Sequence, residues 1–312
     1  MNNCLIKNAI GNTPMVLLSE NPMIYGKLEG QNLYGSAKDR AALYIIQYLL
    51  DKNIINQSTE IVESSSGNFA IGIAGVCKSF GLKFTCVIDP LLNETNKTIL
   101  RQLGANLVLV SKPDENNNYL KSRLSKVKEI VANNSNTYWI NQYDNPLIPN
   151  AYKALGEEIV KQLDKIDYIF IPVSTCGTIA GISQFIKSYN SKIKIIGVDL
   201  DCSNIFYPAK TKQHIPGMGL FRQPGNLANA KIDDVVIVSE IDCIKACKSL
   251  LNIGIFVGAS SGGTYNAIKT YLPNIKPSDV VVAICPDRGE RYVKTVFCDE
   301  WCKKTYGDYF DT

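Results

Sequence analysis

Short apolar runs alternate with amphipathic stretches along most of the chain. The runs at 83–88 and 168–173 are mostly apolar, which is typical of strands buried on both faces. Apolar residues at 42–50 recur every three or four positions, and this spacing predicts a helix with one buried face. The same patterns predict strands at 60–63, 83–88, 106–110, 168–173, 193–198, 235–238 and 280–284, and helices at 42–50, 68–78, 95–103, 119–132 and 178–189.

The alternation of strands and helices indicates the fold class. A strand, a helix and another strand in series form a βαβ unit, so the expected class is α/β, with parallel sheets flanked by helices. The chain has 312 residues, which favours two domains at roughly 150 residues each. The segment 143–149 is expected to be a loop or a crossing between domains.

Composition narrows the chemistry. The chain has one histidine, His214, which excludes sites built from several histidines and argues against Ser-His-Asp catalysis. Proton transfer is then expected from a lysine, a carboxylate, a tyrosine or a cofactor. His214 is expected in a loop, outside the catalytic set.

Charge and cysteine content exclude other classes. The 33 basic and 29 acidic residues leave a net charge of +4, which predicts neither a nucleic-acid nor a membrane partner. The ten cysteines show no C-x-x-C spacing, so no metal is expected. The pairs Cys243/Cys247 and Cys298/Cys302 are expected to pack on helix faces. Reduced thiols, no signal segment and no apolar run of 18 residues predict a cytoplasmic protein.

Two turns in the first quarter of the chain carry candidate chemistry. Lys38 follows small residues at the start of a predicted helix, where the helix dipole lowers the pKa of an amine and favours Schiff-base chemistry. A solvated lysine is the alternative. The strand at 60–63 runs into Ser65, Ser66, Gly67 and Asn68, whose hydroxyls and N–H groups suit an anion such as a carboxylate. An ordinary helix cap is the alternative.

Two later turns have similar features. Residues 174–178, between a strand and a helix, suit a phosphate, although they match neither G-x-G-x-x-G nor the Walker motif. Ser260, in the turn 258–263, suits a hydrogen bond to a neutral ring nitrogen. For both turns the alternative is a tight capped turn.

The order and spacing of these four turns resemble those of the fold-type II pyridoxal-phosphate enzymes, in particular the cysteine synthase family, from 10–15 to 286–292. The resemblance implies a tryptophan synthase β-like two-domain fold, pyridoxal 5′-phosphate as cofactor and a homodimer. It implies a larger cofactor-binding domain of residues 1–40 plus 149–312, and a smaller mobile substrate-binding domain of residues 41–148.

The resemblance also implies a role for each turn. Lys38 corresponds to the lysine that binds the cofactor and moves the Cα proton, Asn68 to the contact with the ring oxygen, and Ser260 to the contact with the pyridine nitrogen. Ser65, Ser66 and Gly67 correspond to the residues that bind the substrate's α-carboxylate. The loop that binds the cofactor phosphate corresponds to Ser174, Thr175, Cys176, Gly177 and Thr178.

The chain departs from the usual cysteine synthase pattern. Phe69 replaces a threonine, Ser174 and Cys176 replace glycines, and 32–36 reads N-L-Y-G-S instead of N-P-G-G-S. These changes favour a donor or nucleophile other than those of cysteine synthesis.

The segments 138–143, 172–175 and 286–289 resemble the siderophore-pathway branch of the family. That branch makes N-(2-amino-2-carboxyethyl)-L-glutamate from O-phospho-L-serine and L-glutamate, on the way to 2,3-diaminopropionate. Arg123, Tyr143 and Ser174 match its substrate-recognising positions.

Three alternatives stay open. The first is an O-acetylserine sulfhydrylase. The second is a threonine dehydratase-like lyase, which the absence of an appended regulatory region disfavours. The third is a catalytically silent binding protein, which the presence of Lys38, Asn68 and Ser260 disfavours.

Overall fold

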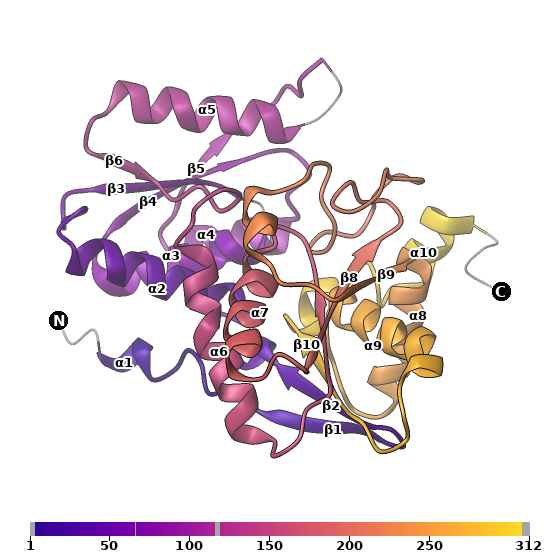
Figure 1. Cartoon of the computed structure of the whole chain (residues 1–312). Helices are drawn as coiled ribbons and strands as arrows, with labels where there is room; N and C mark the ends of the chain where they lie inside the picture. Colours follow the sequence, from indigo (N-terminus) through magenta and orange to yellow (C-terminus); the bar gives the residue numbers. More distant parts are fainter. Residues whose placement is uncertain (1–3, 66, 116–118, 308–312) are drawn as a thin grey trace. The chain divides into compact units, whose positions relative to one another are not determined.

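The computed structural model describes residues 4–65, 67–115 and 119–307. The chain divides into two compact units. The small unit comprises Met1–Ile10 and Lys38–Asn145, and the large unit comprises Gly11–Ala37 and Pro146–Thr312. Each unit has its own sheet with helices packed against it (Figure 1).

The small unit contains a four-stranded, fully parallel sheet in the order β5-β4-β3-β6. Figure 1 shows α5 on one face of this sheet and α2 and α3 on the other. The elements are α1 (Cys4–Lys7), α2 (Lys38–Asp51), β3 (Glu60–Ser64), α3 (Asn68–Phe80), β4 (Lys83–Ile88), α4 (Glu94–Gln102), β5 (Asn106–Leu109), α5 (Tyr119–Asn133) and β6 (Thr137–Trp139).

Helix α3 is apolar on almost every side because it lies between the sheet and α2. Only its ends are polar, and ten of its thirteen residues are buried. It ends at Gly81, whose φ of 70° is left-handed, a conformation that glycine adopts without steric cost. The side chain of Phe69 is only 2% exposed, so this departure from the family pattern lies in the packed interior.

The large unit contains a six-stranded sheet in the order β1-β2-β10-β7-β8-β9. All its pairs are parallel except β1–β2, which is antiparallel. Figure 1 shows the helix pairs α6–α7 and α8–α9 on opposite faces. The strands are β1 (Met15–Glu20), β2 (Met23–Leu28), β7 (Tyr168–Pro172), β8 (Lys194–Leu200), β9 (Asp234–Val238) and β10 (Val280–Cys285). The helices are η1 (Glu29–Gln31), α6 (Ile148–Gln162), α7 (Gly177–Tyr189), η2 (Gly225–Asn229), α8 (Glu240–Asn252), α9 (Ala259–Tyr271), η3 (Leu272–Asn274), η4 (Gly289–Tyr292) and α10 (Asp299–Tyr306).

The α/β class with parallel sheets flanked by helices is confirmed. The predicted strands and helices agree with the structure to within two residues, except that the first helix begins at Lys38. The antiparallel β1–β2 pair is a correction, because βαβ periodicity predicts only parallel strands. The expected loop at 143–149 is shorter, since α6 begins at Ile148.

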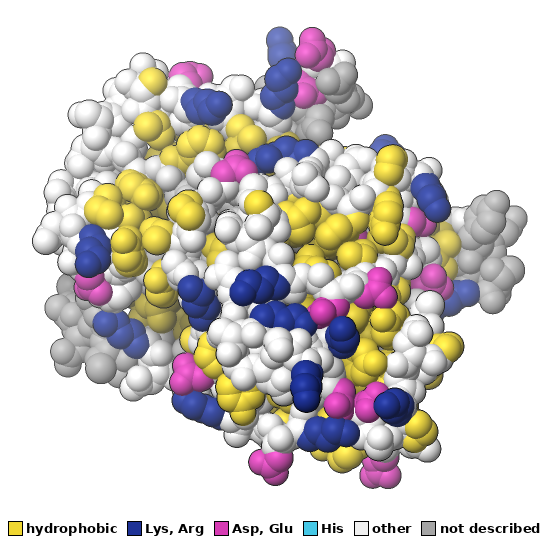
Figure 2. All heavy atoms as spheres, in the orientation of Figure 1, with side chains coloured by type: hydrophobic (Ala, Val, Ile, Leu, Met, Phe, Trp, Pro, Cys, Tyr) yellow, Lys and Arg dark blue, Asp and Glu magenta, His cyan; other side chains and the backbone are white. Residues whose placement is uncertain are grey.

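Lysine and arginine side chains are interspersed with acidic and neutral ones on the face drawn in Figure 2. Within residues 4–65, 67–115 and 119–307, no helix is both long and apolar enough to cross a membrane.

Candidate active site

Residues 174–178 lie at the carboxyl edge of the large sheet, in the turn that follows β7 and in the first two residues of α7. Cys176 precedes α7 in the left-handed conformation, with a φ of 59°, and α7 begins at Gly177. The first N–H groups of an α-helix have no intrahelical partner. Together with the helix dipole, they form a site suited to a phosphate.

Packing fixes the shape of this turn. A Cβ at Gly177 would lie 2.3 Å from Ile148 Cγ2, so only glycine allows α6 to approach the start of α7 this closely. The hydroxyl of Ser174 donates to the carbonyl of Gly219 at 3.0 Å, and the Gly219 N–H donates to the carbonyl of Val173 at 2.8 Å. The turn at 174–178 is therefore fixed by Ile148 of α6 and by the backbone of Gly219.

Ser260 lies at the same edge, in the first turn of α9, and is buried. The Gly258 N–H donates to the carbonyl of Asp287 at 3.1 Å, which attaches the start of α9 to the end of β10. A Cβ at Gly258 would lie 2.0 Å from Asp287 Oδ1, so glycine is required here too. Because β10 is next to β7, Ser260 and the 174–178 turn share one edge of the sheet.

The segment before Lys38 is attached to this edge as well. Ser36 forms a β-bridge with Asp287, and the Ala37 N–H donates to the carbonyl of Pro286 at 2.8 Å. Lys38 is the next residue and the first residue of α2. An amine at a helix N-terminus experiences a dipole that disfavours its charged form.

In the small unit, β3 leads into the serine- and asparagine-containing turn. Ser65 is buried, and its carbonyl accepts a hydrogen bond from Cys86 Sγ at 3.1 Å. Ser66 lies outside the described residues. Gly67 precedes α3, which begins at Asn68, and a Cβ at Gly67 would meet no atom within 4 Å. Open space beside a helix start leaves room for a ligand at this turn.

A buried carboxylate lies directly before this turn. Glu63 is 0% exposed, and its two oxygens accept hydrogen bonds from the backbone N–H of Ser64 at 2.6 Å, from Trp139 Nε1 at 3.2 Å and from the Gln142 N–H at 3.1 Å. Gln142 Nε2 in turn donates to the carbonyl of Ser64 at 3.1 Å. Burial raises the pKa of Glu63 from 4.5 to about 7, although these hydrogen bonds and Arg123 act to lower it.

Arg123, on α5, is 8% exposed and pairs through Nε with Asp89 Oδ2 at 3.2 Å. Its Nη1 group has no hydrogen-bond acceptor among the described residues. Tyr143 follows Gln142 in the loop before α6 and is buried. The small unit thus contains an arginine with hydrogen-bonding capacity to spare.

These groups fit pyridoxal phosphate. The 174–178 turn offers helix N–H groups and hydroxyls for the phosphate. Ser260 offers a neutral hydroxyl for a ring nitrogen, and Lys38 offers a primary amine for a carbonyl carbon. The residues that would hold the cofactor therefore have the right chemistry for each of its three polar parts.

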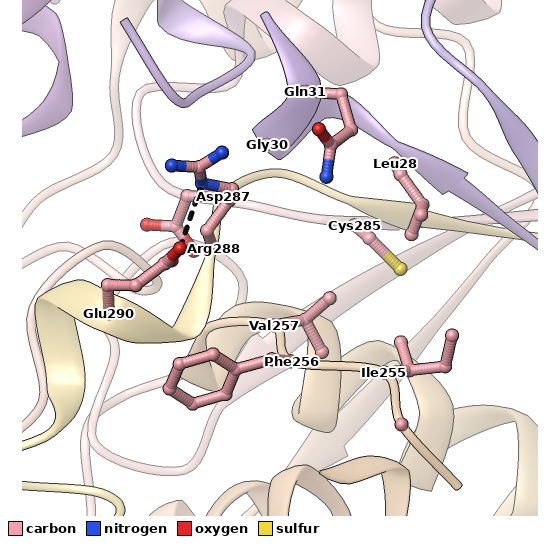
Figure 3. A pocket seen from close by; sticks show the side chains of 11 residues that line it. Leu28, Gly30, Gln31, Ile255, Phe256, Val257, Cys285, Asp287, Arg288 and Glu290 are labelled. Carbon is pink, nitrogen blue, oxygen red and sulfur yellow. Dashed lines mark ion pairs between the residues drawn. The ribbon is translucent and has the colours of Figure 1, made fainter.

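A cavity of about 220 Å³ lies in the large unit and is lined in part by residues 254–257. Figure 3 shows Phe256, Val257 and Ile255 facing Gln31 and Cys285, with the Arg288–Glu290 ion pair, 3.3 Å long, at one side. Its lining residues are Leu28, Gly30, Gln31, Gly254, Ile255, Phe256, Val257, Cys285, Asp287, Arg288 and Glu290. None of them is a predicted site residue, so this cavity is not the candidate active site.

His214 lies in a loop, as expected, and its contacts join that loop to two helices. Its backbone N–H donates to buried Glu240 at 2.9 Å, and its ring lies edge-on to Tyr306, with centroids 5.7 Å apart. The Tyr306 hydroxyl also donates to Glu240, at 3.0 Å. These contacts attach the loop after β8 to α8 and α10.

The thiols of the described part of the chain form no metal-site arrangement. Among the described residues, no group of three or more His, Cys, Asp and Glu side chains could hold a metal ion. Cys243 and Cys247 are both buried on α8, and burial raises the pKa of Cys247 to about 12. Cys298 is a correction to the helix-face prediction, because it precedes α10 while Cys302 lies within it.

Known proteins resemble this chain over nearly its whole length. A family model described as "Pyridoxal-phosphate dependent enzyme" matches residues 6–287, so the chain belongs to that family. The structure of an O-acetylserine dependent cystathionine β-synthase from Helicobacter pylori is 28% identical, with a TM-score of 0.85, over 95% of this chain and 98% of that one.

Two further structures are similar. O-ureido-L-serine synthase is 26% identical, with a TM-score of 0.85, over 95% of this chain and 98% of that one. A hydrogen sulfide-producing enzyme in complex with an α-aminoacrylate intermediate is 30% identical, with a TM-score of 0.86, over 93% and 90%. The chain is a fold-type II enzyme of the cysteine synthase family, with pyridoxal 5′-phosphate as cofactor, and carries out β-replacement on an activated serine.

The structure groups the predicted residues by unit. Residues 174–178 and Ser260 meet at one edge of the large sheet, whereas the turn at 65–68, Arg123 and Tyr143 belong to the small unit. The sequence did not point to Glu63, because its strand reads E-I-V-E-S and nothing in that pattern distinguishes Glu63 from a solvent-exposed carboxylate.

Proposed function

We propose that the enzyme joins O-phospho-L-serine and L-glutamate into N-(2-amino-2-carboxyethyl)-L-glutamate and phosphate, as a step toward 2,3-diaminopropionate and siderophores. The supporting observation is Arg123, a buried guanidinium whose Nη1 group has no acceptor among the described residues. Guanidinium binds phosphate through paired charge-assisted hydrogen bonds. The leaving group of phosphoserine is a negatively charged phosphate, whereas the acetyl group of acetylserine is uncharged.

Pyridoxal phosphate supplies the electron sink for the charge left at Cα when its proton is removed. The Lys38 amine binds the cofactor, takes the Cα proton and returns it at the end. The Cβ–O bond breaks with its electron pair leaving on phosphate. The glutamate amine then forms a bond to Cβ and loses one proton.

Other residues bind and orient the reactants in this proposal. Ser260 meets the pyridine nitrogen without protonating it, which favours β-replacement over transamination. Asn68 contacts the ring oxygen, and Ser65, Ser66 and Gly67 hold the α-carboxylate. Arg123, Tyr143 and Ser174 recognise the substrate, and Ser174, Thr175, Cys176, Gly177 and Thr178 hold the cofactor phosphate.

We extend the proposal to the assembly. The enzyme acts as a cytoplasmic homodimer, and residues 41–148 move as a substrate-binding domain relative to 1–40 plus 149–312. Light scattering of the purified holoenzyme measures its mass in solution. A mass of about twice 34.5 kDa supports the homodimer, and a mass of about 34.5 kDa contradicts it.

Lys38→Ala tests the assignment of the reacting amine. The variant should lose both the cofactor's visible absorption band and all turnover, since the proposal assigns the covalent bond and the proton transfer to this amine. Lys52→Ala, which changes an exposed lysine just beyond α2, is the matched control and should keep both. A Lys38→Ala variant with normal turnover contradicts the assignment.

Arg123→Ala tests the choice of donor. The KM for phosphoserine should rise at least about tenfold, because one charge-assisted contact contributes about 1.5–3 kcal/mol. The KM for acetylserine should change little. Lys126→Ala, which breaks an exposed pair with Glu129 on the same helix, is the control. Equal effects of Arg123→Ala on both donors contradict phosphate recognition by this residue.

An O-acetylserine-dependent activity is the second candidate. It is favoured by the similarity to the Helicobacter pylori enzyme, which is described as O-acetylserine dependent. In that case sulfide or another thiol replaces glutamate as nucleophile. Product analysis with both donors and both nucleophiles separates the two candidates.

A further inference from the structure

Three hydrogen bonds converge on the buried carboxylate of Glu63, and all three partners are donors. They are the Ser64 N–H at 2.6 Å, Trp139 Nε1 at 3.2 Å and the Gln142 N–H at 3.1 Å. An ionised carboxylate only accepts hydrogen bonds, so it satisfies all of them. A protonated carboxyl carries a donor of its own. That donor has no acceptor among these three partners, and the oxygen that carries the proton accepts a hydrogen bond less strongly.

Glu63 connects two segments that are far apart in the sequence. It lies at the end of β3, two residues before Ser65, and its Oε2 atom holds the Gln142 backbone. Gln142 Nε2 returns to the Ser64 carbonyl at 3.1 Å, and Cys86 Sγ donates to the Ser65 carbonyl at 3.1 Å. The contact of Gln142 with the Ser64 carbonyl thus connects Glu63 to the backbone directly before Ser65, while Cys86 fixes the Ser65 carbonyl independently.

We propose that Glu63 is a positioning residue: its ionised carboxylate holds residues 139–142 against the end of β3 and so orders the substrate-binding turn, and protonation releases the Gln142 N–H and loosens that turn. The inference rests on the proposed role of Ser65 and Gly67 in binding the substrate's carboxylate. It adds a pH-dependent control on that binding.

The titratable groups that neighbour Glu63 come from three elements. From α5, Arg123 favours the ionised form of Glu63, while its partner Asp89 offsets part of that charge. From β4, the Cys86 thiol faces Glu63, and burial raises its pKa to about 12, so it stays neutral. Burial also raises the pKa of Cys77 on α3, the helix that contacts β3. Of these described neighbouring groups, Glu63, with a pKa of about 7, is the one that changes charge near neutral pH.

The indole N–H of Trp139 reports directly on Glu63 without any substrate. The chain has two tryptophans, so a Trp301→Phe background leaves Trp139 as the one indole signal in a ¹⁵N-tryptophan NMR spectrum of the holoenzyme. Its proton should shift with a midpoint near pH 7, because the carboxylate accepts a stronger hydrogen bond than the neutral acid. Adding Glu63→Gln should abolish the titration. A signal that is constant from pH 6 to 8, or one that titrates equally in Glu63→Gln, overturns the proposal.

Kinetics test the effect on binding. If only the ionised form orders the turn, the donor's KM should rise about tenfold from pH 8 to pH 6, with kcat nearly unchanged. In Glu63→Gln the KM should be raised at both pH values and lose this dependence. Glu60→Gln removes a carboxylate from the same strand and should behave like wild type. A Glu63→Gln variant with the wild-type pH profile overturns the role. If no donor reacts at all, the proposed function fails, while the Trp139 titration still decides the role of Glu63.

Discussion

Replacing Glu63 by glutamine should change how stability depends on pH. Burial raises the pKa of Glu63 from 4.5 to about 7 in the folded protein. A tenfold change in an acid dissociation constant corresponds to about 1.4 kcal/mol, so this increase in pKa on folding amounts to about 3 kcal/mol. Because the folded-state pKa is raised, this stabilisation is fully present below pH 4.5 and is lost as the pH rises through 7. About 2 kcal/mol of the loss falls between pH 5.5 and 8.5.

The assay is urea denaturation of the holoenzyme at pH 5.5, 7 and 8.5, followed by circular dichroism. Wild type should lose about 2 kcal/mol more than Glu63→Gln between the lowest and highest pH, since glutamine does not titrate. Taking the difference between the two proteins removes the contribution of every other group. Glu60→Gln should follow wild type. A difference between wild type and Glu63→Gln that stays constant to within about 0.5 kcal/mol refutes the reasoning.

Two further predictions concern the large unit. Gly177→Ala should weaken cofactor retention, measured by the rate of cofactor loss on dilution, because the new Cβ would lie 2.3 Å from Ile148 Cγ2. Gly197→Ala, whose Cβ would meet its nearest neighbour at 3.5 Å, should retain the cofactor normally, and equal losses would contradict this account. Lys27→Met should cost about 3 kcal/mol in denaturant unfolding, because it removes the partner of Glu158 at 2.9 Å from a buried ion pair. A loss of unfolding free energy below about 1 kcal/mol would show that other contacts compensate for the removed ion pair.

The repeating part of the fold was predictable because its signal is local. The strand β4 matches its apolar run of 83–88, and α5 matches its amphipathic spacing to within one residue. The candidate turns were predictable for a different reason. Each lies between a strand and a helix, where free N–H groups and small residues leave a recognisable pattern, and only their order along the chain made the combination specific.

Long-range contacts were not predictable. The parallel pairing of β2 with β10 joins residues 23–28 to residues 280–285, and no local pattern describes it. The partners of Glu63 at Trp139 and Gln142 are 76 and 79 residues away in the sequence. Likewise, the ion pair of Arg123 with Asp89 joins α5 to the end of β4, and helical spacing alone would place this arginine at the surface.

The most direct test of the account is product analysis by mass spectrometry. The holoenzyme is mixed with O-phospho-L-serine or O-acetyl-L-serine, and then with L-glutamate or sulfide. Phosphoserine and glutamate should give N-(2-amino-2-carboxyethyl)-L-glutamate and one equivalent of phosphate, and acetylserine should give little product. Cysteine from acetylserine and sulfide, with no product from phosphoserine and glutamate, would contradict it.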